Sequence, residues 1–225
     1  VKKLTMIESC TIDRDSESTT LGSAMIDSGE LIGEAYIRVY LITIQNGVTE
    51  KHPLATVLVQ TPSDQFDGKT KTYSMDAYTP LLELNEKYPD IGYFIPKGEN
   101  IMDQVYKHLT EQMRAPVIAT ACAEELNDNF ITDPTDTWLT TLIDLAAGAE
   151  YKFALDEMGQ VLLVPKQKTA ALQPVWTYTD DDSSILYSDV GKEQDLYGIP
   201  NVVEVVCSTN EGILISVVKN EDAGS

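Results

Sequence analysis

The stretch DTWLTTLIDLAAGAEYKFALDEMGQVLLVP, residues Asp136–Pro165, specifies one supersecondary unit, a short amphipathic helix followed directly by a β-hairpin. Four apolar residues beside Trp138 recur at the i, i+3, i+4, i+7 spacing of one helical face: Leu139, Leu142, Ile143 and Ala146. The stretch carries no residue that looks reactive. It indicates a scaffold, although an ordinary helix and hairpin of any α+β domain gives the same pattern.

The ends of this helix are marked by capping residues. Asp133 can cap a helix whose first residue is Pro134, where the missing N–H is tolerated, or Asp136 can cap a shorter helix beginning at Thr137. Gly148 is expected to take the left-handed conformation that commonly ends a helix. Both starts remain open at this point.

The second half of the stretch predicts two strands and a turn. Apolar and other residues alternate from Tyr151 to Leu155, residues 156–159 (Asp-Glu-Met-Gly) are turn formers, and Val161–Val164 returns as a more apolar strand.

Composition bounds the class of protein. The 225 residues, 43% of them hydrophobic, are enough for one large or two modest domains without a disulfide or metal staple. No run of about eighteen apolar residues exists, and the start VKKLTMIESC lacks the apolar core of a signal peptide. We expect no membrane insertion, no visible export and synthesis in a cytoplasm.

Cysteine and histidine are scarce. Cys10, Cys122 and Cys207 are odd in number and far apart, so they predict reduced, small core residues rather than a disulfide framework or a zinc site. His52 and His108 are the only histidines, which limits mechanisms that need an imidazole base or ligand. We expect surface or structural roles for both.

The chain is strongly acidic, with 36 acidic and 16 basic residues and a formal charge of −20. Such a surface repels phosphate backbones and disfavours specific nucleic-acid binding. Two interpretations stay open: the charge serves solubility, or it lines a passage that DNA crosses without adhering. The second requires acidic side chains gathered on one concave surface.

The order of predicted elements is β, then α/β, then β. Polar segments at Asp13–Thr20, Asp27–Gly29 and Pro62–Lys71 separate the first strands, and the Asn-Gly pair within Gln45–Val48 predicts a tight hairpin turn. A helix-like cluster at Met75–Tyr88, a brief strand and a helix capped by Asn100 follow. The predicted strands cover Leu4–Ile12, Tyr36–Ile44, Leu54–Gln60, Gly92–Pro96, Val175–Tyr178, Ile185–Tyr187, Val202–Val206 and Ile213–Val218.

This order predicts an α+β fold, with a β-rich domain over residues 1–72, an inserted α/β module over 73–170 and returning strands over 171–225. The sequence contains no P-loop, dinucleotide-binding, HExxH or GxSxG motif. Asp180, Asp181 and Asp182 lack the spacing of an EF-hand loop, so a solvated loop is expected there instead of a calcium site. We assign no catalytic, cofactor-binding or metal-binding residue and expect no cofactor.

Several phrases, taken in order, resemble one family. They are TIDRDSESTTLGSA (residues 11–24), YSMDAYTPLLEL (73–84), GYFIPKGENIMDQVYKHL (92–109), DEMGQVLLVP (156–165) and DLYGIPNVVEVV (195–206). Together they resemble the tail or baseplate hub proteins of long-tailed bacteriophages and prophages, including the N-terminal structural part of tail-associated lysins.

The resemblance implies a virion structural protein at the tail tip. Its barrel-like antiparallel β domains would form a homotrimeric ring of pseudo-sixfold symmetry that closes the tail tube and lets DNA pass, next to the distal tail protein ring, the tape measure protein and tail fibre or lysin components. It also implies that this chain is a fragment, because family members continue into a second barrel. Lysin domains lie further toward the C-terminus, so no catalytic residue is carried over.

Two further expectations come from the residues. In one, Ile37, Val39 and Leu41, or the opposite face of their strand, contribute to a barrel wall. In the other, the chain belongs to a different function class, either an acidic cell-wall glycan hydrolase, which needs two carboxylates facing across a cleft, or a surface carbohydrate-binding module.

Overall fold

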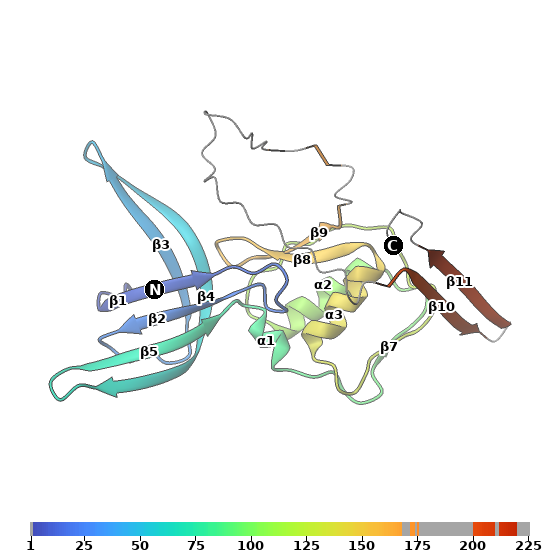
Figure 1. Cartoon of the computed structure of the whole chain (residues 1–225), viewed down its shortest axis with the longest axis horizontal. Helices are drawn as coiled ribbons and strands as arrows, with labels where there is room; N and C mark the ends of the chain where they lie inside the picture. Colours follow the sequence, from blue (N-terminus) through green and yellow to red (C-terminus); the bar gives the residue numbers. More distant parts are fainter. Residues whose placement is uncertain (1, 168–171, 174, 176–199, 210–211, 220–225) are drawn as a thin grey trace. The chain divides into compact units, whose positions relative to one another are not determined.

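The computed structural model describes residues 2–167, 172–173, 175, 200–209 and 212–219 (Figure 1). The chain divides into two compact units, residues 1–172 and residues 173–225. The first unit contains a β-sheet and an α/β module, and the second contains one described hairpin. Each unit is treated by itself below.

The first unit begins with a five-stranded antiparallel sheet in the order β1-β2-β5-β4-β3. Its strands are β1 (Ile7–Asp13), β2 (Ser23–Ser28), β3 (Tyr36–Gln45), β4 (Val48–Phe66) and β5 (Lys71–Tyr78). Asn46 and Gly47, with φ of 50° and 78°, form the predicted tight turn between β3 and β4. The Asn-Gly prediction is confirmed.

Strand β4 is shared by two ribbons. Its first half pairs with β3 and its second half pairs with β5, and only Leu58 pairs with both. The register shifts between Val39 and Tyr40 and again between Val59 and Thr61, as at β-bulges, which bend a strand. The β3–β4 ribbon therefore extends away from the other strands, as Figure 1 shows; we call residues 38–56 the β3–β4 arm.

All five strands contribute to one apolar cluster, so the sheet curves around it. The cluster contains Ile12, Ala24, Ile26, Ile37, Val57, Val59, Met75 and Ala77. The described strands β1 and β3 are the two ends of this sheet and do not pair with each other, so this is an open sheet and the closed barrel stays a prediction. Ile37 contributes to the cluster, whereas Leu41 is half exposed.

Two parts of the expected β region were wrong. Asp27 and Ser28 belong to β2 rather than to a turn, because hydrogen-bonded partners on both sides, β1 and β5, hold them extended. Residues 75–78 lie in β5 rather than in a helix, for the same reason, since β5 is paired with both β2 and β4. The chain turns back between β4 and β5 at Asp67, whose carboxylate accepts the backbone N–H groups of Lys69 and Thr70. Residue 72, where the β-rich domain was expected to end, therefore lies inside a strand.

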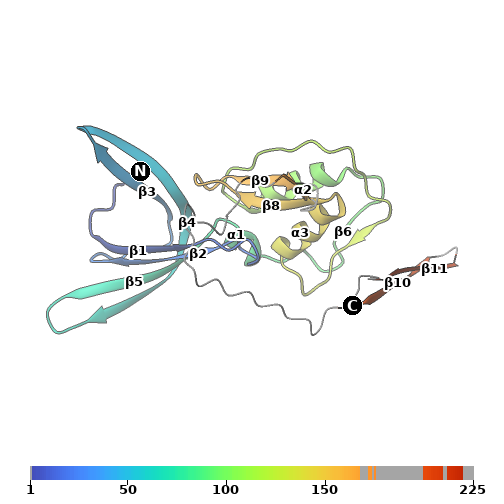
Figure 2. The ribbon, with the colours of Figure 1, turned by 45° about the horizontal axis from the view of Figure 1, so that its top comes forward.

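The α/β module follows the sheet (Figure 2). Its elements are α1 (Leu82–Asn85), β6 (Phe94–Ile95), α2 (Ile101–Gln112), β7 (Phe130–Ile131), α3 (Trp138–Gly148), β8 (Tyr151–Leu155) and β9 (Val161–Pro165). The helices and the β8–β9 hairpin enclose a second apolar core that includes Leu84, Val105, Leu109, Leu139, Leu142, Leu145 and Val161, each at most 1% exposed. The predicted helix face and hairpin are confirmed.

The helix ends in the module confirm one capping prediction and correct two others. Asn100 caps α2, since its side chain accepts the N–H of Asp103. Helix α3 is capped by Thr137, whose hydroxyl accepts the N–H of Thr140, so both predicted starts were wrong. Gly148 remains inside α3, and Glu150 takes the left-handed conformation, with φ of 60°.

The second unit contains the antiparallel pair β10 (Val202–Thr209) and β11 (Gly212–Lys219), which confirms the last two predicted strands. Every side chain of β11 is exposed. The predicted strands at 176–178 and 185–187 and the three aspartates at 180–182 lie outside the described residues.

Candidate assembly surfaces and the junction between sheet and module

The tip of the β8–β9 hairpin is bound to strands β3 and β4. The Thr56 hydroxyl donates to the Glu157 carbonyl over 3.1 Å, and an Arg38 guanidinium nitrogen donates to the Met158 carbonyl over 3.2 Å. Arg38 also donates to the Thr56 hydroxyl over 3.2 Å. These three bonds fix the hairpin tip on the sheet.

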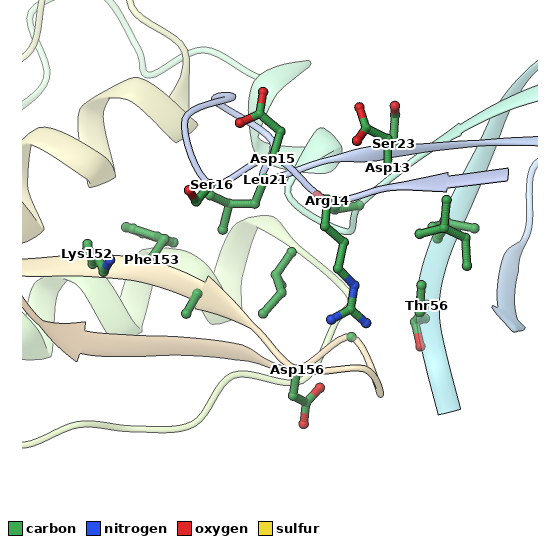
Figure 3. A pocket seen from close by; sticks show the side chains of 17 residues that line it. Asp13, Arg14, Asp15, Ser16, Leu21, Ser23, Thr56, Lys152, Phe153 and Asp156 are labelled. Atoms are coloured by element: carbon green, nitrogen blue, oxygen red, sulfur yellow. The ribbon is translucent and has the colours of Figure 1, made fainter. Parts of the chain in front are cut away.

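Arg14 makes a second link at the same place. It follows β1, donates to the Leu54 carbonyl and forms an ion pair of 3.2 Å with the Glu157 carboxylate. The pairing with Arg14, together with a backbone N–H, lowers the pKa of Glu157. Figure 3 shows Arg14 reaching between the sheet and the hairpin tip.

Arg114, which follows α2, makes a link from the module to another part of the sheet. Its guanidinium binds Glu83 of α1 and lies 2.9 Å from Glu34, which precedes β3. Its backbone N–H also donates to Glu83 over 2.7 Å, and its guanidinium lies 5.3 Å from the centre of the Tyr36 ring. Burial, with the Glu83 charge, raises the pKa of Tyr36.

The chain contains three arginines against thirteen lysines, and all three arginines lie at this junction. A planar guanidinium can bind several acceptors in fixed directions, which an ammonium group does less well. The arginines therefore hold the module on the sheet in one orientation within the first unit. Sequence reasoning missed them; the signal was the rarity of arginine in an acidic chain.

A cavity of about 350 Å³ lies between the loop after β1, strand β4 and the β8–β9 hairpin (Figure 3). Three carboxylates line it, from Asp13, Asp15 and Asp156. Asp156 accepts the N–H of Gln160 over 2.7 Å, which stabilises the hairpin turn. Figure 3 shows the Asp156 carboxylate directed away from the other two, so these three do not form the facing pair that a glycan hydrolase needs.

Histidine and cysteine take different places from one another. His108 is buried, stacks 4.7 Å from the Trp138 ring and lies 2.7 Å from the Tyr93 hydroxyl, so its predicted structural role is confirmed. Burial lowers the pKa of His108. Cys10 and Cys207 are exposed free thiols, so their assignment to a core was wrong; apolar character alone did not bury these small side chains.

Two features were searched for across the part of the chain that the structure describes. There, no group of three or more His, Cys, Asp or Glu side chains is placed to hold a metal ion. In the same residues no helix has the length and apolar character needed to cross a membrane.

Exposed apolar side chains gather on two hairpins. On the β3–β4 arm they are Tyr40, Leu41, Ile42, Ile44 and Val48, between 41% and 72% exposed. On the hairpin of the second unit they include Val203, Val205, Leu214, Ile215 and Val217. A two-stranded hairpin with apolar exposed faces is at best marginally stable alone, which marks both as candidate assembly surfaces.

No protein-family model and no curated protein matches the chain, whereas solved structures do. The tail protein from Neisseria meningitidis MC58 matches with a TM-score of 0.68 and 16% identity, over 96% of this chain and 64% of that chain. The 43 kDa tail protein of prophage MuSo2 from Shewanella oneidensis matches with a TM-score of 0.51 and 15% identity, over 74% and 52%. This chain therefore has the fold of these tail proteins and spans about half to two thirds of their length.

Proposed function

We propose that the chain is a structural component of a phage or prophage tail, located at the tail tip or baseplate hub. The observation that carries the proposal is the fold shared with the Neisseria tail protein over 96% of this chain. The second match, to a prophage tail protein, supports the same class. A site of action in the virion tail follows from this class.

The chain acts as one subunit of a homotrimeric ring that closes the tail tube. The distal tail protein ring, the tape measure protein and tail fibre or lysin components are its neighbours. Its open sheet and its exposed apolar hairpins fit a subunit that is completed by assembly. DNA passes through the ring without specific binding, and the charge of −20 supports this because it repels phosphates.

The acidic passage has a constraint from the sheet. The inner face of the curved sheet is filled by apolar side chains, among them Ile26, Val59 and Met75. An acidic lumen must therefore be formed by other faces of the subunit. Asp27 and Asp76 lie on the opposite face, since their cross-strand neighbours alternate with the buried residues.

The proposal is tested on virions of the phage or induced prophage that encodes the chain. Purified particles are analysed by mass spectrometry, and the chain is located by immunogold labelling with an antibody against it. We expect the chain in the particles and gold at the distal end of the tail. Its absence from the particles, or gold only on the head or along the tube, overturns the proposal.

A further inference from the structure

The sheet of the first unit has two open ends of different character. Strand β3 ends it on one side and β1 on the other, and the described residues contain no strand beyond either. An edge strand presents backbone N–H and C=O groups that can pair with another chain. Both edges are therefore candidates for strand pairing between molecules.

The β3 edge is apolar on the face opposite the core. Side chains alternate along a strand, so Tyr40, Ile42 and Ile44 share one face. Their cross-strand neighbours on β4 are Pro53, Lys51 and Thr49. Ile44 is 72% exposed, and a row of this kind on an unprotected edge is a site for association.

The two ends of the sheet differ in charge. Residues 36–60, from β3 through the first half of β4, carry Arg38 and Lys51 against Glu50, a net charge of +1. Residues 7–28, from β1 to β2, carry five acidic residues and one arginine, a net charge of −4. In a chain of charge −20, contact between a β3 end and a β1 end avoids the repulsion that two acidic ends would meet.

We propose that the β3 edge of one copy pairs with the β1 edge of a second copy, so that the sheet continues from subunit to subunit. β3 has ten residues and β1 has seven, so the whole of β1 can be paired. The contact is head-to-tail, and head-to-tail contacts close into rings when the rotation allows. This inference rests on the proposed function for the ring, and it names the surfaces that meet in it.

The test uses the full chain and sedimentation velocity over a concentration series. Ile42→Glu and Ile44→Glu together place charge on the β3 edge and are expected to raise the dissociation constant of the self-associated form at least about tenfold. Ile91→Glu is the matched control, because Ile91 is 90% exposed on the module and is expected to leave association unchanged. Val217→Glu reports on association through the second unit.

A mixing experiment tests the head-to-tail geometry. A second variant, Glu8→Lys with Asp13→Lys, reverses charge on the β1 end. Each double variant alone is expected to lose association, whereas a mixture of the two restores a heterodimer, because one molecule keeps an intact β1 edge and the other an intact β3 edge. Circular dichroism melts confirm that the variants are folded.

The outcomes separate this inference from the proposed function. Association that is unaffected by the β3 variant, or that is lost only with Val217→Glu, overturns the β3–β1 contact and leaves the tail assignment standing. A chain that stays monomeric at every concentration overturns the contact as well. Failure of the mixture to restore a heterodimer overturns the head-to-tail arrangement.

Discussion

The substitution Gly159→Ala tests whether the hairpin tip holds the module on the sheet. Gly159 ends the β8–β9 turn with φ of 79°, and a Cβ atom placed there would lie 2.7 Å from Cβ of Thr56. Real Cβ atoms do not approach so closely, so the hairpin tip has to move away from β4. That movement breaks the bonds from Thr56 and Arg38 to the carbonyls of Glu157 and Met158.

The expected loss has two parts. An alanine in the left-handed conformation costs about 1–2 kcal/mol. Overpacking against Thr56 adds roughly 1–3 kcal/mol. We therefore expect the free energy of unfolding to fall by about 2–4 kcal/mol, measured by urea denaturation followed by circular dichroism.

Gly98→Ala is the matched control. Gly98 also has a positive φ, 84°, but a Cβ atom there would meet nothing within 4 Å. It should lose only the backbone part, about 1–2 kcal/mol. Equal losses for the two variants would refute the reasoning, because they would show that the contact between Gly159 and Thr56 does not constrain the hairpin.

Three further predictions concern the junction and the core. Arg114→Ala removes both carboxylate contacts and should lower the melting temperature, and Arg114→Lys should retain part of the difference; no change in either variant would contradict a role for Arg114 at the junction. Because burial holds the pKa of His108 below its ordinary value of about 6.5, the unfolded chain binds the proton first, so stability should fall as pH drops below about 6.5. In urea titrations His108→Gln should flatten that dependence, and an unchanged slope between about pH 7 and 5.5 would contradict it. Leu142→Ala, at a fully buried core position, should lower the free energy of unfolding by about 2–5 kcal/mol, whereas a loss below about 1 kcal/mol would place Leu142 outside the core.

The elements whose signals are local were predictable from the sequence. Helix α2 has a side-chain cap at Asn100 and apolar residues at four-residue intervals, and both hairpin turns contain glycines at positive φ. These signals lie within a few residues of each other. No distant partner was needed to read them.

The elements that depend on distant partners were not predictable. Strand β2 is short and ends in Asp27 and Ser28, which are turn formers in isolation, and β1 and β5 on its two sides make it a strand. Strand β5 has leucines and a proline shortly after it, and the pattern of that later segment was extended back over residues 75–78. In both cases pairing decided the structure against local preference.

The junction was also hidden from the sequence. Arg14 and Glu157 are 143 residues apart, and Arg38 binds a carbonyl group of the hairpin, which no sequence pattern marks. Only the concentration of all three arginines at one boundary gives the rarity of arginine a meaning. A charge count shows a uniformly acidic chain, whereas the fold separates an acidic β1 end from a slightly basic β3 end.

The most direct test of the tail assignment is a cryo-electron microscopy reconstruction of the tail tip of the phage or induced prophage that encodes the chain. The account predicts three copies around the tail axis, each with the curved sheet and the helix-hairpin module, and β3 of one copy beside β1 of the next. A tail tip built entirely from other chains would contradict the account.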